Sequence, residues 1–112
     1  MLKYIKSSKS KHTYKLVPGY YEWVFYSDGK PVYAVGDVSD LFESYDRDGI
    51  MEVADEVASF MQYDSECLKY KDYENCNSDA ILSGSFADID FVSDFDVIKE
   101  SIFEALHRHY GD

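Results

Sequence analysis

The chain has 112 residues, with 22 acidic and 11 basic side chains and a formal net charge of −11. The length favours one domain spanning residues 1–112, and hydrophobic and aromatic fractions of 46% and 17% exclude a disordered acidic tail. The acidic balance argues against direct nucleic-acid binding, which needs a basic surface.

The first third of the chain predicts an antiparallel sheet. Residues 11–17 alternate in polarity, and residues 20–26 are rich in aromatic and β-branched side chains. The Ser-Asp-Gly-Lys turn at residues 27–30 precedes a further strand at residues 31–35, so we predict a β-hairpin there. Residues 2–6 predict an edge strand with exposed lysines.

Helical spacing begins after residue 36. An apolar stripe at Val38, Leu41, Phe42 and Tyr45 predicts a short helix that begins at Asp37. A second stripe from Ile50 to Met61 predicts an amphipathic helix, with Asp48 as its N-cap. Its opposite face carries Glu52, Asp55 and Glu56 and is therefore acidic.

The remaining chain is less regular. Residues 64–79 have no consistent period and predict a loop or a short irregular strand, whereas the alternation in residues 80–92 favours a strand. A last helix is predicted from an N-cap at Ser93 to Gly111. We therefore expect an α+β fold, an N-terminal antiparallel sheet of three or four strands packed against two or three helices.

Residues 44–55 resemble a calcium-binding loop of the EF-hand type. With Gly49 as the sixth position, Asp46, Asp48 and Glu52 fall at the third, fifth and ninth positions. The first and twelfth positions depart from the pattern, since they are Ser44 and Asp55. The resemblance implies a calcium-responsive regulator, while helix capping explains the same residues without a metal.

Other catalytic or metal-binding patterns are incomplete. Cys67 and Cys76 are too far apart for a zinc or redox motif, and His107 and His109 point about 200° apart on a helix. No nucleophile or phosphate-loop motif occurs. We therefore predict no enzyme activity, no cofactor and no metal.

The compartment follows from two further features of the sequence. Two cysteines are few for a small secreted domain, so reduced thiols are expected, with a Cys67–Cys76 disulfide as the alternative. No signal peptide is predicted, and no apolar run reaches the ~20 residues of a spanning helix. We expect a cytoplasmic protein that does not bind membranes.

The acidic side chains themselves are the best functional candidates. Residues 31–112 carry a net charge of −15. The pairs Glu52/Glu56 and Glu100/Glu104 stand about 6 Å apart on a helix, close to the spacing of every second phosphate on a nucleic-acid strand. Asp88 and Asp90 would repeat similarly on a strand.

We therefore expect a small, non-enzymatic inhibitor that binds a basic, nucleic-acid-binding protein by phosphate mimicry, as a phage anti-restriction or anti-CRISPR protein does. An immunity protein or antitoxin that neutralises a basic nuclease toxin is the alternative, because it would use the same physics. The predicted partner-binding residues are Asp40, Glu43, Glu52, Asp55, Glu56, Asp88, Asp90, Glu100 and Glu104.

Overall fold

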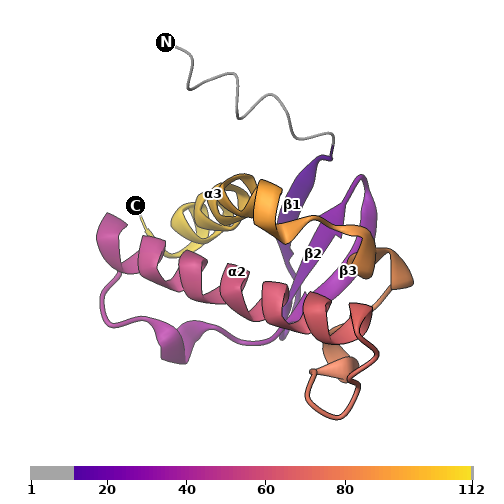
Figure 1. Cartoon of the computed structure of the whole chain (residues 1–112). Coiled ribbons are helices and arrows are strands. Elements are labelled where there is room, and N and C mark those ends of the chain that lie inside the picture. The colour runs from indigo at the N-terminus through magenta and orange to yellow at the C-terminus, as the bar shows by residue number, and fades with distance from the viewer. Residues whose placement is uncertain (1–11, 112) are drawn as a thin grey trace.

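The sheet is antiparallel, and two helices pack against it in a computed structural model that describes residues 12–111 (Figure 1). The strands β1 (Tyr14–Pro18), β2 (Trp23–Ser27) and β3 (Lys30–Val35) lie in the order β1-β2-β3. The predicted α+β class is confirmed. The strand predicted at residues 2–6 lies outside the described residues.

The hairpin predicted around Asp28 and Gly29 is present. Both residues have positive φ angles, 55° and 83°, as a two-residue type I′ turn requires. The Asp28 carboxylate also accepts a hydrogen bond from the Thr13 backbone N–H at 2.8 Å and contacts His12 Nδ1 at 2.6 Å. These contacts with His12 and Thr13 lower the pKa of Asp28 and tie the turn to the start of β1.

The strand predicted at residues 20–26 begins later, at Trp23. The Gly19 backbone N–H donates to the Glu22 carbonyl at 2.7 Å and closes a tight turn between β1 and β2. Tyr20 and Tyr21 therefore lie at the tip of this turn, where 88% and 81% of their surfaces are exposed.

The first long helix, α2 (Arg47–Lys69), starts earlier and ends later than predicted. Its N-cap is Asp46 and not Asp48, because the Asp46 carboxylate accepts the Gly49 backbone N–H at 2.8 Å. A Cβ atom at Gly49 would come within 2.4 Å of the Ser44 carbonyl oxygen, so this position needs glycine. Part of the loop predicted at residues 64–79 thus belongs to the helix.

Short 3₁₀ turns replace two other predicted elements. Residues 37–45 contain the short 3₁₀ turn η1 (Ser39–Leu41) in place of the predicted α-helix. Helices of so few residues are marginally stable by themselves. Residues 80–92 form no strand. They contain the end of η2 (Ser78–Ala80), then η3 (Gly84–Asp88). An isolated bridge between Ile81 and Tyr33 and the ring stacking of Phe86 on Tyr33 join this segment to β3.

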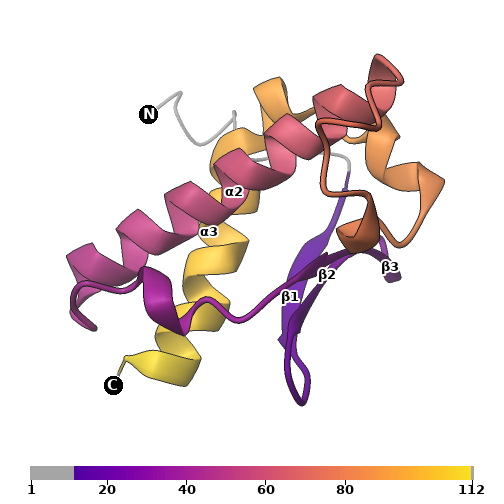
Figure 2. The ribbon, with the colours of Figure 1, turned by 90° about the horizontal axis from the view of Figure 1, so that it is seen from below.

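The second helix, α3 (Phe91–Tyr110), begins before the predicted cap at Ser93. The Asp90 carboxylate accepts the backbone N–H groups of Val92 and Ser93, each at 3.2 Å, and so caps the helix. Gly111 ends it, as predicted. α3 lies beside β1, and α2 crosses α3 at a wide angle (Figure 2).

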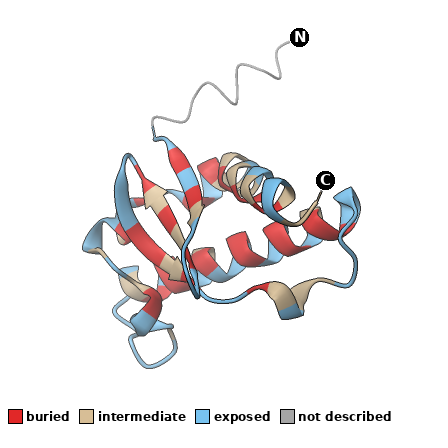
Figure 3. Ribbon diagram, turned by 180° about the vertical axis from the view of Figure 1, so that it is seen from behind, coloured by how far each residue is buried: buried red, intermediate tan, exposed pale blue. Residues whose placement is uncertain are grey.

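The core lies where the sheet and the two helices face one another, and exposed residues cover the outer surfaces (Figure 3). Phe25, Met61 and Ile98 are fully buried there, and Trp23 is 5% exposed. Trp23 and Phe25, both on β2, therefore belong to the core. Among residues 12–111, no helix combines the length and apolarity needed to cross a membrane.

Candidate protein-binding surface

A row of exposed acidic side chains follows the outer side of α2, with four acids between Asp48 and Glu56 and a fifth at Glu66. Because each residue of an α-helix advances by about 100°, the exposed acids of α2 lie within an arc of about 100° around the helix axis. From Asp48 to Glu66 the row is about 27 Å long. This row, called the acidic ridge below, consists of Asp48, Glu52, Asp55, Glu56 and Glu66, all exposed.

The ridge has no basic counterpart on the described part of the chain. Arg47 lies over the Phe103 ring at 4.9 Å, and the Lys69 ammonium donates to the Ile89 carbonyl at 3.4 Å. Between described residues, the one ion pair is His12–Asp28, at the turn between β2 and β3. The ridge carboxylates therefore face solvent without a neutralising side chain from residues 12–111.

Two further predicted residues belong to the segment that connects β3 to α2. The segment 36–46 leaves β3 and returns alongside α2 (Figures 1 and 2). It carries the exposed residues Asp40 and Glu43. Asp37 was predicted as the start of a helix and not as a partner-binding residue. Its carboxylate accepts the Ser39 backbone N–H at 2.9 Å, a contact that lowers the pKa of Asp37.

The other predicted acids belong to different surfaces. Glu100 and Glu104 form a second exposed row on α3 with Asp96. Because the two helices cross, this row and the acidic ridge run in different directions (Figure 2).

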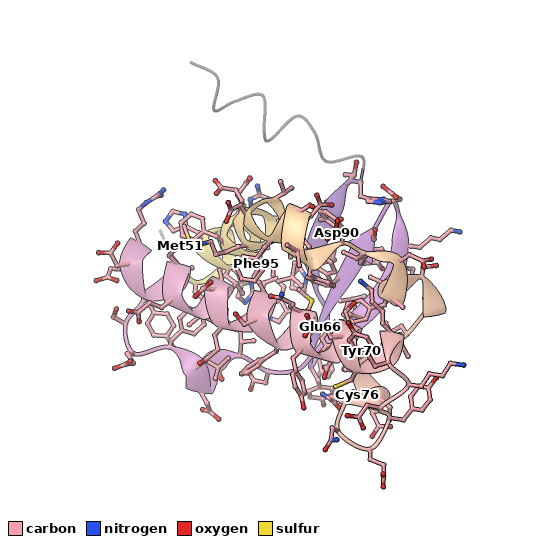
Figure 4. All side chains as sticks on the ribbon, viewed as in Figure 1. Met51, Glu66, Tyr70, Cys76, Asp90 and Phe95 are labelled. Carbon is pink, nitrogen blue, oxygen red and sulfur yellow. The ribbon has the colours of Figure 1, made fainter. Side chains whose placement is uncertain are left out.

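The prediction that Asp88 and Asp90 share one face of a strand is wrong. Asp88 ends the 3₁₀ turn η3, and Asp90 is the N-cap of α3. Asp90 lies at the start of α3 (Figure 4). Met51 lies near the start of α2, and Glu66 and Tyr70 lie near its other end. The hydrogen bonds from the Ser93 and Val92 N–H groups, and the charge of Lys69, lower the pKa of Asp90.

The calcium-loop residues form the start of a helix. Residues 47–55 are helical, so their side chains project outward along α2 and do not converge on one point. Asp46 uses its carboxylate to accept from Gly49 and from the Ser44 hydroxyl at 2.9 Å. Within residues 12–111, no group of three or more His, Cys, Asp or Glu side chains is arranged to hold a metal ion.

A cleft of about 470 Å³ opens between the end of β3 and the second half of α2, on one flank of the acidic ridge. The sequence interpretation missed it because its two walls come from segments about twenty residues apart. The main lining residues are Tyr33, Val35, Val57, Phe60, Tyr63 and Asp64.

The floor of the cleft holds a buried carboxylate. Asp64 is 5% exposed. It accepts a hydrogen bond from the Tyr33 hydroxyl on one oxygen and from the Asn77 backbone N–H, at 3.1 Å, on the other. Burial and the Asp64 hydrogen bond raise the pKa of Tyr33 well above its ordinary value, so Tyr33 stays a neutral donor.

Both cysteines are free thiols, with Cys67 buried and Cys76 partly buried.

No protein-family model, curated protein or solved structure matches the chain. The acidic ridge and the cleft beside it are therefore the two candidate binding features of the described residues.

Proposed function

We propose that the protein is a small, non-enzymatic inhibitor that binds a basic, nucleic-acid-binding protein of the cytoplasm through the acidic ridge, in place of that protein's nucleic acid. The observation that carries the proposal is the row of five exposed carboxylates on α2 without an ion-pair partner from residues 12–111. Asp40 and Glu43 extend this surface alongside the helix.

The spacing of the ridge supports phosphate mimicry. Asp48, Glu52 and Glu56 follow one another at intervals of four residues, or about 6 Å along the helix axis. Phosphates on one strand of a duplex rise by about 3.4 Å each, so these carboxylates match every second phosphate. A surface that binds a phosphate row with Lys and Arg side chains would meet similar charge at similar intervals.

Repulsion between the carboxylates of α2 also favours binding of a basic partner. Like charges four residues apart destabilise a helix by about 0.2–0.5 kcal/mol per pair. A basic partner relieves this repulsion on binding, and opposite surface potentials also accelerate association at low salt. The ridge thus lowers the stability of the free protein slightly while favouring a cationic partner.

The test is capture of a partner from a bacterial lysate at low salt, using the wild type and two charge-reversed variants. The ridge variant is Glu52→Lys/Asp55→Lys/Glu56→Lys. The matched control is Asp96→Lys/Glu100→Lys/Glu104→Lys, which makes the same change in charge on α3. All six side chains are exposed, so circular dichroism of both variants should match the wild type.

We expect the wild type and the α3 control to retain a nucleic-acid-binding protein that added DNA displaces, and the ridge variant to lose it. Capture of a nuclease encoded beside this protein's gene would identify the immunity or antitoxin form of the same mechanism. A partner without nucleic-acid-binding activity, or equal capture by the ridge variant, would refute the proposal.

A further inference from the structure

The cleft beside the ridge combines an apolar wall with a buried carboxylate. Val57 and the Phe60 ring supply the wall on the α2 side, and the end of β3 supplies the other side. Asp64 lies at the floor. Among the described residues, no basic side chain lines the cleft.

The hydrogen bonds of Asp64 leave acceptor capacity unused. A carboxylate has about four lone-pair sites. The Tyr33 hydroxyl and the Asn77 backbone N–H each donate to a different oxygen of Asp64. Both donors are neutral. A cation that enters the cleft would therefore meet a carboxylate that no cationic donor already occupies.

Two aromatic side chains border the entrance. Phe60 and Tyr63 are 52% and 54% exposed, although both belong to a helix whose other apolar residues are largely buried. Aromatic faces at a cleft entrance attract cations through the ring quadrupole. Glu56, one turn before Phe60, adds a further exposed negative charge on the same flank.

We infer that this cleft receives the side chain of an arginine from the basic partner, with the guanidinium at Asp64 and the aliphatic stem against Val57 and Phe60. The inference rests on the proposed function, since the arginine belongs to the protein that binds the acidic ridge. Arginine fits better than lysine because its planar guanidinium stacks on aromatic rings and donates two parallel hydrogen bonds to a carboxylate.

The volume of the cleft is compatible with this occupant. Pockets for small ligands measure about 300–1,000 Å³, and the cleft has about 470 Å³. A buried arginine anchor surrounded by weaker surface contacts is also the usual arrangement of an interface hot spot. The ridge would then steer the partner, and the cleft would fix its position.

The first test needs no partner. The ¹⁵N-labelled protein is titrated with N-acetyl-L-arginine amide, with the lysine analogue, and with the neutral citrulline analogue, while backbone amide shifts are followed by NMR. We expect saturable shifts at Gly36, Asp64 and Asn77 with arginine amide, at a Kd of about 1–10 mM. Citrulline amide should cause none, and equal shifts with citrulline would overturn the inference.

Two variants test the lining residues. Asp64→Asn removes the charge and should weaken arginine-amide binding at least about tenfold. Its control is Asp94→Asn, which alters the other buried carboxylate that accepts from a tyrosine, at Tyr14. Phe60→Ala changes an exposed ring without disturbing the core, and Leu82→Ala is its control at similar exposure.

Wild-type affinity in Phe60→Ala would overturn the inference even if Asp64→Asn fails to fold. The captured partner then separates the two proposals. If Phe60→Ala captures the partner as well as the wild type while the ridge variant does not, the arginine site is wrong and phosphate mimicry stands. If arginine amide binds in the cleft but the ridge variant captures the partner normally, the mimicry proposal is wrong and the cation site stands.

Discussion

The Tyr33 hydroxyl of β3 donates a hydrogen bond to the buried Asp64 carboxylate of α2, and this pair joins the outer strand of the sheet to the helix that carries the acidic ridge. A second pair repeats the arrangement at the other edge of the sheet. There the Tyr14 hydroxyl of β1 donates to the Asp94 carboxylate of α3 at 2.6 Å. Each helix is thus fixed to the sheet by one tyrosine and one carboxylate.

The first prediction concerns the energy of the Tyr33–Asp64 pair. Tyr33→Phe leaves a buried carboxylate oxygen without this donor, which should lower the free energy of unfolding by about 1–3 kcal/mol. Tyr70→Phe is the control, since Tyr70 is 81% exposed. Urea unfolding measures both variants. An equal, small effect in both would mean that the Tyr33–Asp64 pair does not stabilise the fold.

The second prediction concerns alkaline pH. Burial, followed by the neighbouring carboxylates, raises the pKa of both Tyr14 and Tyr33 above the ordinary value near 10. Above about pH 10 these tyrosines lose their protons in the unfolded chain but keep them in the folded protein. The free energy of unfolding therefore falls as pH rises, by about 1.4 kcal/mol per pH unit for each tyrosine.

Urea unfolding between about pH 9 and pH 11 tests this dependence in the double variant Tyr14→Phe/Tyr33→Phe. Its free energy of unfolding should fall less steeply with pH than that of the wild type. Tyr20→Phe/Tyr21→Phe is the matched control, because these hydroxyl groups are on a highly exposed turn, and it should keep the wild-type slope. Equal slopes in all three proteins would contradict the assignment.

The third prediction concerns calcium. Because residues 47–55 are helical and Asp46 caps the helix, folding should not need a metal. The melting temperature should stay within about 1 °C on addition of EDTA or of excess calcium, since a ligand stabilises only the state that binds it. A calcium-dependent rise of several degrees would instead support the regulator suggested by the EF-hand resemblance.

The fourth prediction is that the protein does not bind nucleic acid directly. Its net charge of −11, which already includes the six lysines of residues 1–30, repels a polyanion. Fluorescence polarisation with a labelled DNA duplex at low salt, where electrostatic attraction is strongest, is the measurement. Saturable binding there would contradict phosphate mimicry and make the lysines a nucleic-acid contact.

The sequence predicted the hairpin and the middle of α2 because local patterns determine both. Asp28 and Gly29 are residue types that readily adopt the positive φ angles of a type I′ turn. The length of α2 was missed because its buried stripe continues through Asp64 and Ser65. These polar residues interrupt the apolar period, and their partners, Tyr33 and the Phe86 carbonyl, lie far away in the sequence.

The acidic side chains were identifiable as candidates from charge alone, but their arrangement was not. Exposure of Glu52, Asp55 and Glu56 follows from the helix period, whereas the crossing of α2 and α3 separates them from Glu100 and Glu104. That crossing depends on tertiary packing. The cleft at Asp64 was missed for the same reason, since its walls meet only in the folded protein.

The most direct test of phosphate mimicry is competition for the captured partner. The partner is bound to a fluorescent DNA duplex, and the protein is added at increasing concentration. The wild type and the α3 control should displace the DNA, while the ridge variant Glu52→Lys/Asp55→Lys/Glu56→Lys should need at least about ten times more protein. A complex that holds DNA and this protein together, or equal displacement by the ridge variant, would contradict mimicry by the acidic ridge.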